Sequence, residues 1–194
     1  MGSRRTVSRT MWAGWLVLLG ALATALGLWW RFESRREHQF DPIILDAARR
    51  AGLDPALVKA VVWKESHFNE RARGQAGELG LMQLMDAAAQ EWAASAGVYP
   101  LPLDHLLDPR TNTLAGAWYL ARLARRYQQT DNPLPYALAD YNAGRGNVLK
   151  WLRGPAATNS AAFIEAIGFP ATQQYVREVL ARRERFARDF PPQN

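Results

Sequence analysis

One acidic side chain falls on the apolar face of a predicted helix. The segment 55–65 begins at the pair Asp54-Pro55, which is typical of a helix N-terminus. Successive residues advance by about 100° around a helix, which places Glu65 on one stripe with Leu57, Val58, Val61 and Val62. Burial on that stripe would raise the pKa of the carboxyl and keep it protonated near neutral pH. Glu65 is therefore a candidate general acid, the alternative being a helix that ends at Glu65 with its side chain in solvent.

Two other kinds of chemistry are disfavoured by composition. The chain has no cysteine, which excludes disulfides, thiol catalysis and Cys-based zinc sites. Its three histidines, His38, His67 and His105, are far apart and none belongs to an HExxH motif. We therefore expect no metal centre.

Length and charge limit the class of protein. The 194 residues are 48% hydrophobic and 22% charged, which suits one folded domain and excludes a disordered chain. The net charge is +6, but residues 1–37 carry six Arg against two Glu, and the remainder is nearly balanced. Basic residues that flank an apolar segment favour membrane headgroups as the partner. A nucleic-acid partner, for which only the basic segment 177–188 argues, is not expected.

The N-terminal region contains a long stretch without charge. Residues 12–30 include tryptophans at both ends and, at about 1.5 Å per residue, match the roughly 30 Å hydrocarbon core of a bilayer. This length favours an uncleaved transmembrane anchor over a cleaved secretory signal, whose apolar stretch is about 7–15 residues. The sequence thus divides into a basic tail (1–11), an anchor or signal (12–30), a polar linker (31–39) and a domain (40–190).

The domain is predicted to be all-α. Asp-Pro and Asn-Pro pairs recur at Asp41, Asp54, Asp108 and Asn132, where they favour helix starts, and glycines follow where helices should end. No segment alternates between apolar and polar residues as a strand would. A small β-turn or ribbon near 74–84 is the one alternative. The expected helices are 42–51, 55–65, 87–96, 109–129, 133–142, 145–153, 160–167 and 171–189.

Six short motifs occur in a characteristic order. They are KAVVWKESHFN (59–69), GLMQLM (80–85), DPRTN (108–112), GAWYL (116–120), ADYNAG (139–144) and TQQYV (172–176). Over about residues 40–180 they resemble the lytic transglycosylases of the SLT family, whose fold is similar to goose-type lysozyme. The resemblance implies an all-α, lysozyme-like (goose-type) domain.

The resemblance also implies roles for individual residues. Glu65 matches the single acid/base of the family. Met82 and Gln83 would line the sugar groove, and Tyr141 would lie beside the acid with Asn142 supporting it. Two further residues in these motifs, Ser66 and Tyr175, are assigned to substrate binding.

The implied reaction is cleavage of the MurNAc–GlcNAc β-1,4 bond of peptidoglycan with formation of 1,6-anhydro-MurNAc. The resemblance implies no metal or organic cofactor. The C6 hydroxyl of the substrate replaces water as the nucleophile, and this intramolecular attack makes a second catalytic carboxylate dispensable. The expected partners are peptidoglycan glycan strands, and a membrane through residues 12–30. The expected location is the inner membrane, crossed once, with the catalytic domain in the periplasm.

The chain departs from the family pattern at three positions. Gly74 stands where Ser is frequent, Asp86 where Pro is common, and Ala171 where Glu is frequent. Glu78, just before GLMQ, is an unassigned carboxyl that could partly compensate, although surface solvation is the ordinary role for such a residue.

Two rival functions follow from the same sequence. A goose-type lysozyme would hydrolyse the same bond with a second carboxylate, for which Asp140 and Asp86 are candidates. An inactive, membrane-anchored peptidoglycan-binding scaffold is the other alternative, which the departure at Ala171 keeps open.

Overall fold

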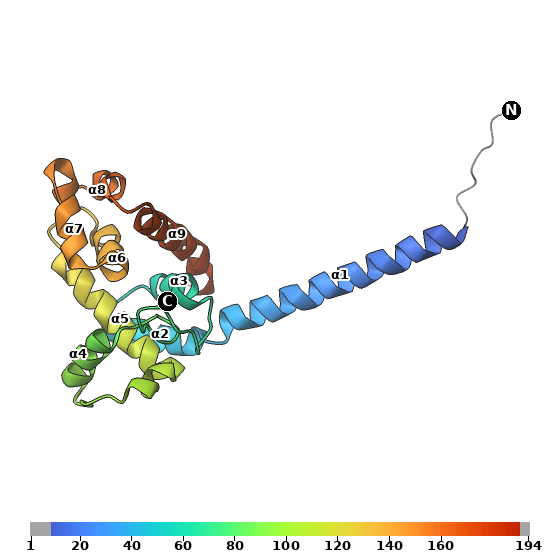
Figure 1. Ribbon diagram of the computed structural model, residues 1–194, viewed down its shortest axis with the longest axis horizontal. Coiled ribbons are helices and arrows are strands. Elements are labelled where there is room, and N and C mark those ends of the chain that lie inside the picture. Colours follow the sequence, from blue (N-terminus) through green and yellow to red (C-terminus); the bar gives the residue numbers. More distant parts are fainter. Residues whose placement is uncertain (1–8, 191–194) are drawn as a thin grey trace. The chain divides into compact units, whose positions relative to one another are not determined.

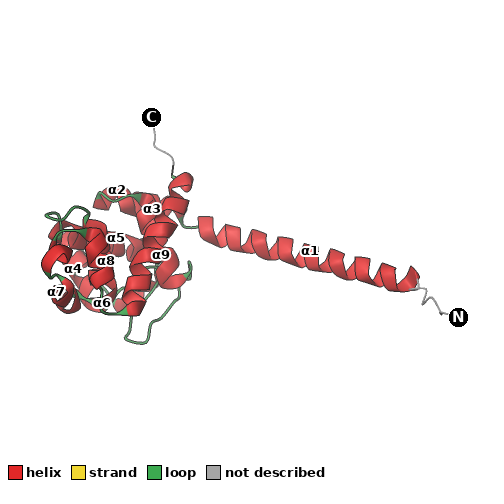
Figure 2. Ribbon diagram, turned by 90° about the horizontal axis from the view of Figure 1, so that it is seen from above, coloured by secondary structure: helices red, strands yellow, loops and turns green. Residues whose placement is uncertain are grey.

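The computed structural model describes residues 9–190, and the chain divides into two units, residues 1–39 and 40–194. The first unit contains one long helix, α1 (Arg9–His38). The second unit contains eight α-helices among its described residues, and its short loops and 3-10 turns connect them (Figures 1 and 2). These helices are α2 (Asp41–Ala51), α3 (Pro55–Ser66), α4 (Asp86–Ala96), α5 (Pro109–Arg126), α6 (Pro133–Ala143), α7 (Arg145–Trp151), α8 (Ser160–Ala166) and α9 (Pro170–Phe186). The all-α prediction for this domain is confirmed.

Helix α3 lies at the centre of the second unit. Its residues from Ala56 to Val62 are all buried, and it packs against α2 on one side and α9 on another. A helix that is apolar on most of its surface is stable only when neighbours cover it. Around these three helices, α5 packs on α2, and α6 packs on both α5 and α9. This arrangement fixes the last turn of α3, where Glu65 lies.

The helix starts follow the predicted capping in most cases. The side chains of Asp54, Asp108 and Asn132 each accept a hydrogen bond from a backbone N–H in the first turn of the helix that follows. Asp41 differs, because it is the first residue of α2 and makes an ion pair with Lys59 instead of a cap.

The buried Lys59 side chain explains that difference. Its ammonium has no exposed surface and lies 2.7 Å from a carboxylate oxygen of Asp41 and 2.7 Å from one of Asp189. A buried cation needs paired anions, and the two carboxylates supply them from either end of the domain sequence. The start of α2 is therefore tied to the segment after α9.

The helix boundaries differ from prediction in a few places. Helix α5 ends at Arg126 rather than near 129, and three 3-10 turns (Leu103–Leu107, Gly154–Ala157 and Ala187–Asp189) occur where no separate element was predicted. Near 74–84 the structure has two isolated antiparallel bridges, Arg73 with Leu79 and Leu79 with Leu84. The alternative of a small ribbon in this region is therefore confirmed in its shortest form.

The predicted polar linker is mostly helical. Residues 31–38 continue α1 as far as His38, because an existing helix extends readily through Glu and Arg residues. Within the part of the chain that the structure describes, no helix combines the length and apolar character needed to cross a bilayer. The transmembrane anchor predicted over 12–30 gains no support from this finding.

Candidate active site

The Glu65 carboxyl is partly buried at the contact between α3 and α9. The Tyr175 hydroxyl of α9 donates a hydrogen bond of 2.6 Å to Glu65 Oε1. The pKa of Glu65 is raised to about 7. Burial raises it most and the negative charge of Glu78 also raises it, whereas the Tyr175 bond and the Lys64 charge lower it. The position predicted on the apolar stripe agrees with the structure, and the alternative of a solvated helix end does not.

Helix α9 presents its partners to α3 at one-turn intervals. Tyr175 is buried and bonds Glu65, whereas Glu178, one turn later, accepts a bond of 2.5 Å from the Lys64 ammonium. Burial also raises the pKa of the Tyr175 hydroxyl well above its ordinary value, so it stays protonated and remains a donor. The bond occupies Oε1 of Glu65 and leaves Oε2 to carry the acidic proton.

Glu65 opens onto a pocket of about 290 Å³. The pocket collects residues from α3, α6 and the loop between α3 and α4. Its lining consists of Glu65, Gly74, Gln75, Glu78, Gln83, Met85, Tyr141 and Asn142. Four predicted site residues, Glu65, Gln83, Tyr141 and Asn142, therefore meet in one place. Gln75, Glu78 and Met85 were not among the predicted site residues.

The turn that carries Gln83 is held by a buried asparagine. The Asn112 side chain of α5 accepts the Met82 N–H at 2.8 Å and donates to the carbonyls of Leu79 (2.8 Å) and Leu106 (2.9 Å). Gln83 has a left-handed backbone (φ 46°), and its Nε2 donates to the Gly80 carbonyl at 2.9 Å. Three bonds to one fully buried side chain make the turn a fixed wall of the pocket.

Tyr141 and Asn142 are the lining residues that α6 contributes. The Tyr141 hydroxyl donates to the Met82 carbonyl at 2.7 Å, so it braces the turn rather than binding Glu65 directly. The Asn142 Oδ1 accepts a bond of 2.8 Å from the Thr172 hydroxyl at the start of α9. Tyr141 lies in the same pocket lining as Glu65, but the hydroxyl that bonds the acid belongs to Tyr175.

Three predicted substrate-binding residues, Tyr175, Met82 and Ser66, lie outside the pocket lining, and Tyr175 instead bonds Glu65. The Met82 side chain has no exposed surface and packs on Gly116, where a Cβ would meet the Met82 Cβ at 2.9 Å. The Ser66 hydroxyl is buried and donates to the Val62 carbonyl one turn back in α3. Met82 therefore faces the core rather than the groove, and the Ser66 hydroxyl is bonded to the backbone of its own helix.

Neither carboxylate proposed for a hydrolytic mechanism lines the pocket. Asp140 is buried and accepts bonds from the guanidinium of Arg126 (2.5 Å) and the hydroxyl of Tyr127 (2.7 Å). Asp86 is exposed at the start of α4 and accepts a bond of 2.9 Å from Gln90. Both residues therefore have structural partners away from Glu65.

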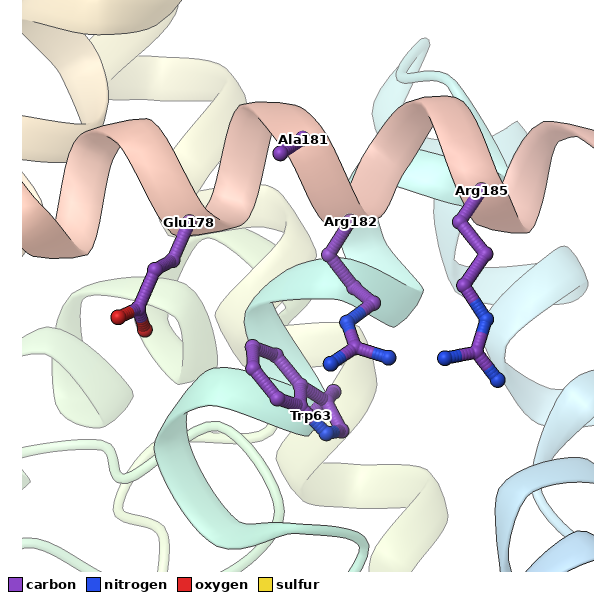
Figure 3. Close-up of a pocket in the computed structure, with 5 residues that line it drawn as sticks. All are labelled: Trp63, Glu178, Ala181, Arg182 and Arg185. Atoms are coloured by element: carbon purple, nitrogen blue, oxygen red, sulfur yellow. The ribbon is translucent and has the colours of Figure 1, made fainter.

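A second pocket, of about 310 Å³, lies between α3 and α9 (Figure 3). Glu178, Ala181, Arg182 and Arg185 extend from α9 beside Trp63 of α3. The Arg182 guanidinium lies 3.7 Å from the centre of the Trp63 ring, a cation–π contact that holds the two helices together. None of the predicted site residues lines this second pocket.

Helices packed around a pocket that holds a partly buried carboxyl with a raised pKa are typical of a lysozyme-like domain, and comparisons with known proteins agree. The transglycosylase SLT domain family matches residues 42–164. The chain therefore belongs to the transglycosylase SLT family.

Similar proteins carry the same domain within longer chains. The chain is 34% identical over 167 residues to the soluble lytic murein transglycosylase of Salmonella typhimurium, covering 84% of this chain and 25% of the relative. It is 37% identical over 113 residues to the membrane-bound lytic murein transglycosylase F of Desulfosudis oleivorans, covering 57% of this chain and 23% of the relative. The chain thus spans about a quarter of the length of these relatives.

Solved structures show the same fold. An inactive Glu-to-Gln mutant of the lytic transglycosylase Slt of Pseudomonas aeruginosa has a TM-score of 0.69 at 30% identity, covering 76% of this chain and 24% of that one. The 70 kDa soluble lytic transglycosylase of Escherichia coli has a TM-score of 0.71 at 27% identity, covering 84% of this chain and 26% of that one.

Proposed function

We propose that this protein is a peptidoglycan lytic transglycosylase that cleaves the MurNAc–GlcNAc β-1,4 bond and forms 1,6-anhydro-MurNAc. The observation that carries the proposal is the Glu65 carboxyl, partly buried in the lining of a pocket with its pKa raised to about 7. A group with that pKa gives up a proton and takes it back near neutral pH, so one residue can serve as acid and then as base. Family membership and the inactive Glu-to-Gln mutant of the Pseudomonas relative support this assignment.

In the first step Glu65 transfers its proton to the glycosidic oxygen. The bond between that oxygen and C1 of MurNAc breaks, its electron pair stays on the leaving GlcNAc, and positive charge develops at C1. Tyr175 keeps the Glu65 side chain in place through the bond to Oε1, and its own raised pKa prevents it from losing its proton to the carboxylate that forms.

In the second step the C6 hydroxyl of the same MurNAc bonds to C1 and transfers its proton to Glu65. The carboxyl is then ready for another cycle, and no water is consumed. The attack is intramolecular, so orientation of the sugar replaces activation of a second reactant. The Gln83 and Asn142 carboxamides, which both line the pocket, offer donors and acceptors for the sugar hydroxyl and acetamide groups.

Hydrolysis of the same bond is the second candidate. Asp140 and Asp86 give it no support, since neither lines the pocket. Glu78 is the other carboxylate in the lining, so the residues present are compatible with both reactions. The chemical identity of the product distinguishes hydrolysis from transglycosylation.

We further propose that the domain works in the periplasm, held at the inner membrane by residues 12–30. Support comes from the charge-free sequence and from the exposed Leu and Trp side chains of α1, among them Leu16, Leu19, Leu22 and Trp29. Fractionation of cells that make the full chain tests this. We expect it in the membrane fraction and open to protease added to the periplasm; recovery of the intact chain in the soluble fraction would contradict membrane attachment.

The activity is tested with purified glycan strands and the Glu65→Gln variant. The amide keeps the size of the side chain but lacks the transferable proton, so turnover should fall by about 10²–10⁴-fold. Equal circular dichroism spectra would show that the variant is folded. Full activity of a folded variant would remove Glu65 from the mechanism. It would also contradict the alternative of an inactive scaffold.

A further inference from the structure

Two carboxyls share the pocket, and each comes from a different part of the chain. Glu65 belongs to α3, whereas Glu78 belongs to the loop that precedes the GLMQ turn. The eight lining residues include these two acidic side chains and no basic one. Lys64, the cation beside Glu65, is bonded to Glu178 of α9. The pocket therefore has a surplus of negative charge once either carboxyl ionises.

The loop holds Glu78 in place with its own backbone. The Ala76 N–H donates to Glu78 Oε2 at 3.0 Å, and the Gly74 N–H donates to the Glu78 carbonyl at 2.8 Å. The adjoining bridge between Arg73 and Leu79 closes this loop. Glu78 is half-buried rather than fully solvated, which differs from the ordinary surface role.

Gly74 provides the space that the Glu78 side chain occupies. A Cβ at position 74 would lie 2.8 Å from Glu78 Cδ and would contact Oε2 more closely still. The backbone of Gly74 is not left-handed, so the glycine is needed for space and not for conformation. The two residues thus form a pair: a side chain at 74 and the carboxylate of 78 compete for one volume.

We propose that Glu78 is a second functional carboxylate of this active site, whose negative charge stabilises the positive charge that develops on the sugar ring as the glycosidic bond breaks. The proposal rests on the proposed function. While Glu65 still carries its proton, Glu78 is the formal negative charge among the lining residues. A fixed charge in a partly water-excluded pocket acts strongly on a transition state whose charge has opposite sign.

Glu78 forms and breaks no bond in this scheme. The proton passes from Glu65 to the leaving oxygen, the C6 oxygen bonds to C1, and the C6 proton returns to Glu65. Once Glu65 has lost its proton, the neighbouring negative charge makes it a stronger base, which favours the second transfer. The charged and titratable groups around Glu65 are Tyr175 and Glu178 on α9, Tyr141 on α6, Lys64 on α3, and Glu78 on the loop.

The first experiment compares Glu78→Gln with Glu70→Gln in the full chain. The amide at 78 still accepts the Ala76 N–H but carries no charge, whereas Glu70 lies earlier in the same connection and does not line the pocket. We expect Glu78→Gln to lower kcat on glycan strands by about 10-fold or more. The alkaline limb of kcat/KM should move to lower pH, because Glu65 loses a neighbour that raises its pKa. Glu70→Gln should match the wild type in both readouts.

The second experiment uses the competition for space. Gly74→Ser should displace the Glu78 carboxylate and reproduce both the loss in kcat and the shift in pH profile. In a Glu78→Ala background, where the space is empty, Gly74→Ser should cause no further loss. Two independent, additive losses would show that the residues do not act as a pair and would overturn this part of the proposal.

The outcomes separate this proposal from the proposed function. If Glu65→Gln is inactive while Glu78→Gln matches Glu70→Gln in kcat and pH profile, the role of Glu78 is refuted and the transglycosylase remains. If Glu78→Gln abolishes a product with a reducing MurNAc end, Glu78 instead serves hydrolysis, and both proposals fail. Thermal denaturation of each variant distinguishes a misfolded loop from a lost charge.

Discussion

At the scale of single residues, the chemistry depends on the pKa of Glu65, which burial and hydrogen bonding shift in opposite directions. Burial raises its pKa, and the Tyr175 hydroxyl lowers it again by bonding the ionised form. The balance near 7 leaves a carboxyl that is protonated before the bond breaks and basic enough to recover its proton afterwards. A fully solvated Glu, with a pKa near 4.5, would be ionised before substrate arrived.

The activity should depend on pH in a defined direction. Because the reaction starts from protonated Glu65, kcat/KM should fall as pH rises through about 7. Initial rates on glycan strands from about pH 5 to about pH 9 would measure this limb. A rate that stays level across this range, with the fold intact, would contradict the raised pKa.

The same pKa affects stability. The pKa of Glu65 is about 7 in the folded state against 4.5 for the unconstrained group, so the folded protein binds the proton more tightly. This contribution is complete below pH 4.5 and is lost as pH rises through about 7. Glu65→Gln cannot lose it, so the Tm of the variant relative to wild type should increase between about pH 4 and about pH 8. A constant difference in Tm across that range would contradict the assignment.

At the scale of elements, α9 and the GLMQ turn do the positioning. The Tyr175 bond orients Glu65 across the α3–α9 contact, and Asn112 of α5 holds the turn that carries Gln83. Sequence patterns located these elements well, because caps, prolines and glycines act locally. They did not reveal the partner of each side chain: Asn112 is part of a helix-start motif, yet its bonds reach a turn 30 residues away.

Removing the α9 contact should change the pH profile in the opposite direction to loss of Glu78. Tyr175→Phe keeps the buried ring and deletes the donor that lowers the pKa of Glu65. We expect the alkaline limb of kcat/KM to move to higher pH while kcat falls by about 10-fold through lost orientation. An alkaline limb that moves to lower pH would contradict the direction assigned to this hydrogen bond.

Asn112→Ala should show how far the turn depends on α5. Loss of this fully buried side chain removes the Asn112 partner of the Met82 N–H and of the Leu106 carbonyl, while the Leu79 carbonyl keeps the Leu84 N–H; this should cost about 2–4 kcal/mol of unfolding free energy. Activity should fall as well, since Gln83 is no longer held. Asp140→Asn is the control: it breaks the Arg126 pair outside the pocket, so stability should drop while kcat of the folded enzyme changes little. Urea denaturation with kinetics at low denaturant separates the two effects.

At the scale of the whole molecule, the all-α domain and its lysozyme-like class were predictable, whereas several details were not. Lys59 is a charged residue that does not belong to the apolar stripe of Leu57, Val58, Val61 and Val62, yet it is buried because Asp41 and Asp189 pair with its ammonium. Met82 belongs to a recognisable motif, but its side chain packs in the core, in space that the absence of a Cβ at Gly116 leaves open. Glu78 lines the pocket, and its side chain occupies space that any side chain at position 74 would fill. Each depends on residues distant in sequence or on the shape of a loop, which periodicity does not encode.

The most direct test of the central claim is the mass of the product. Digestion of purified sacculi by the full chain, followed by mass spectrometry, should give muropeptides with 1,6-anhydro-MurNAc ends, each lighter by one water than the hydrolytic product. Glu65→Gln should give almost none. Muropeptides that carry mainly reducing MurNAc ends would contradict the account and identify the protein as a hydrolase.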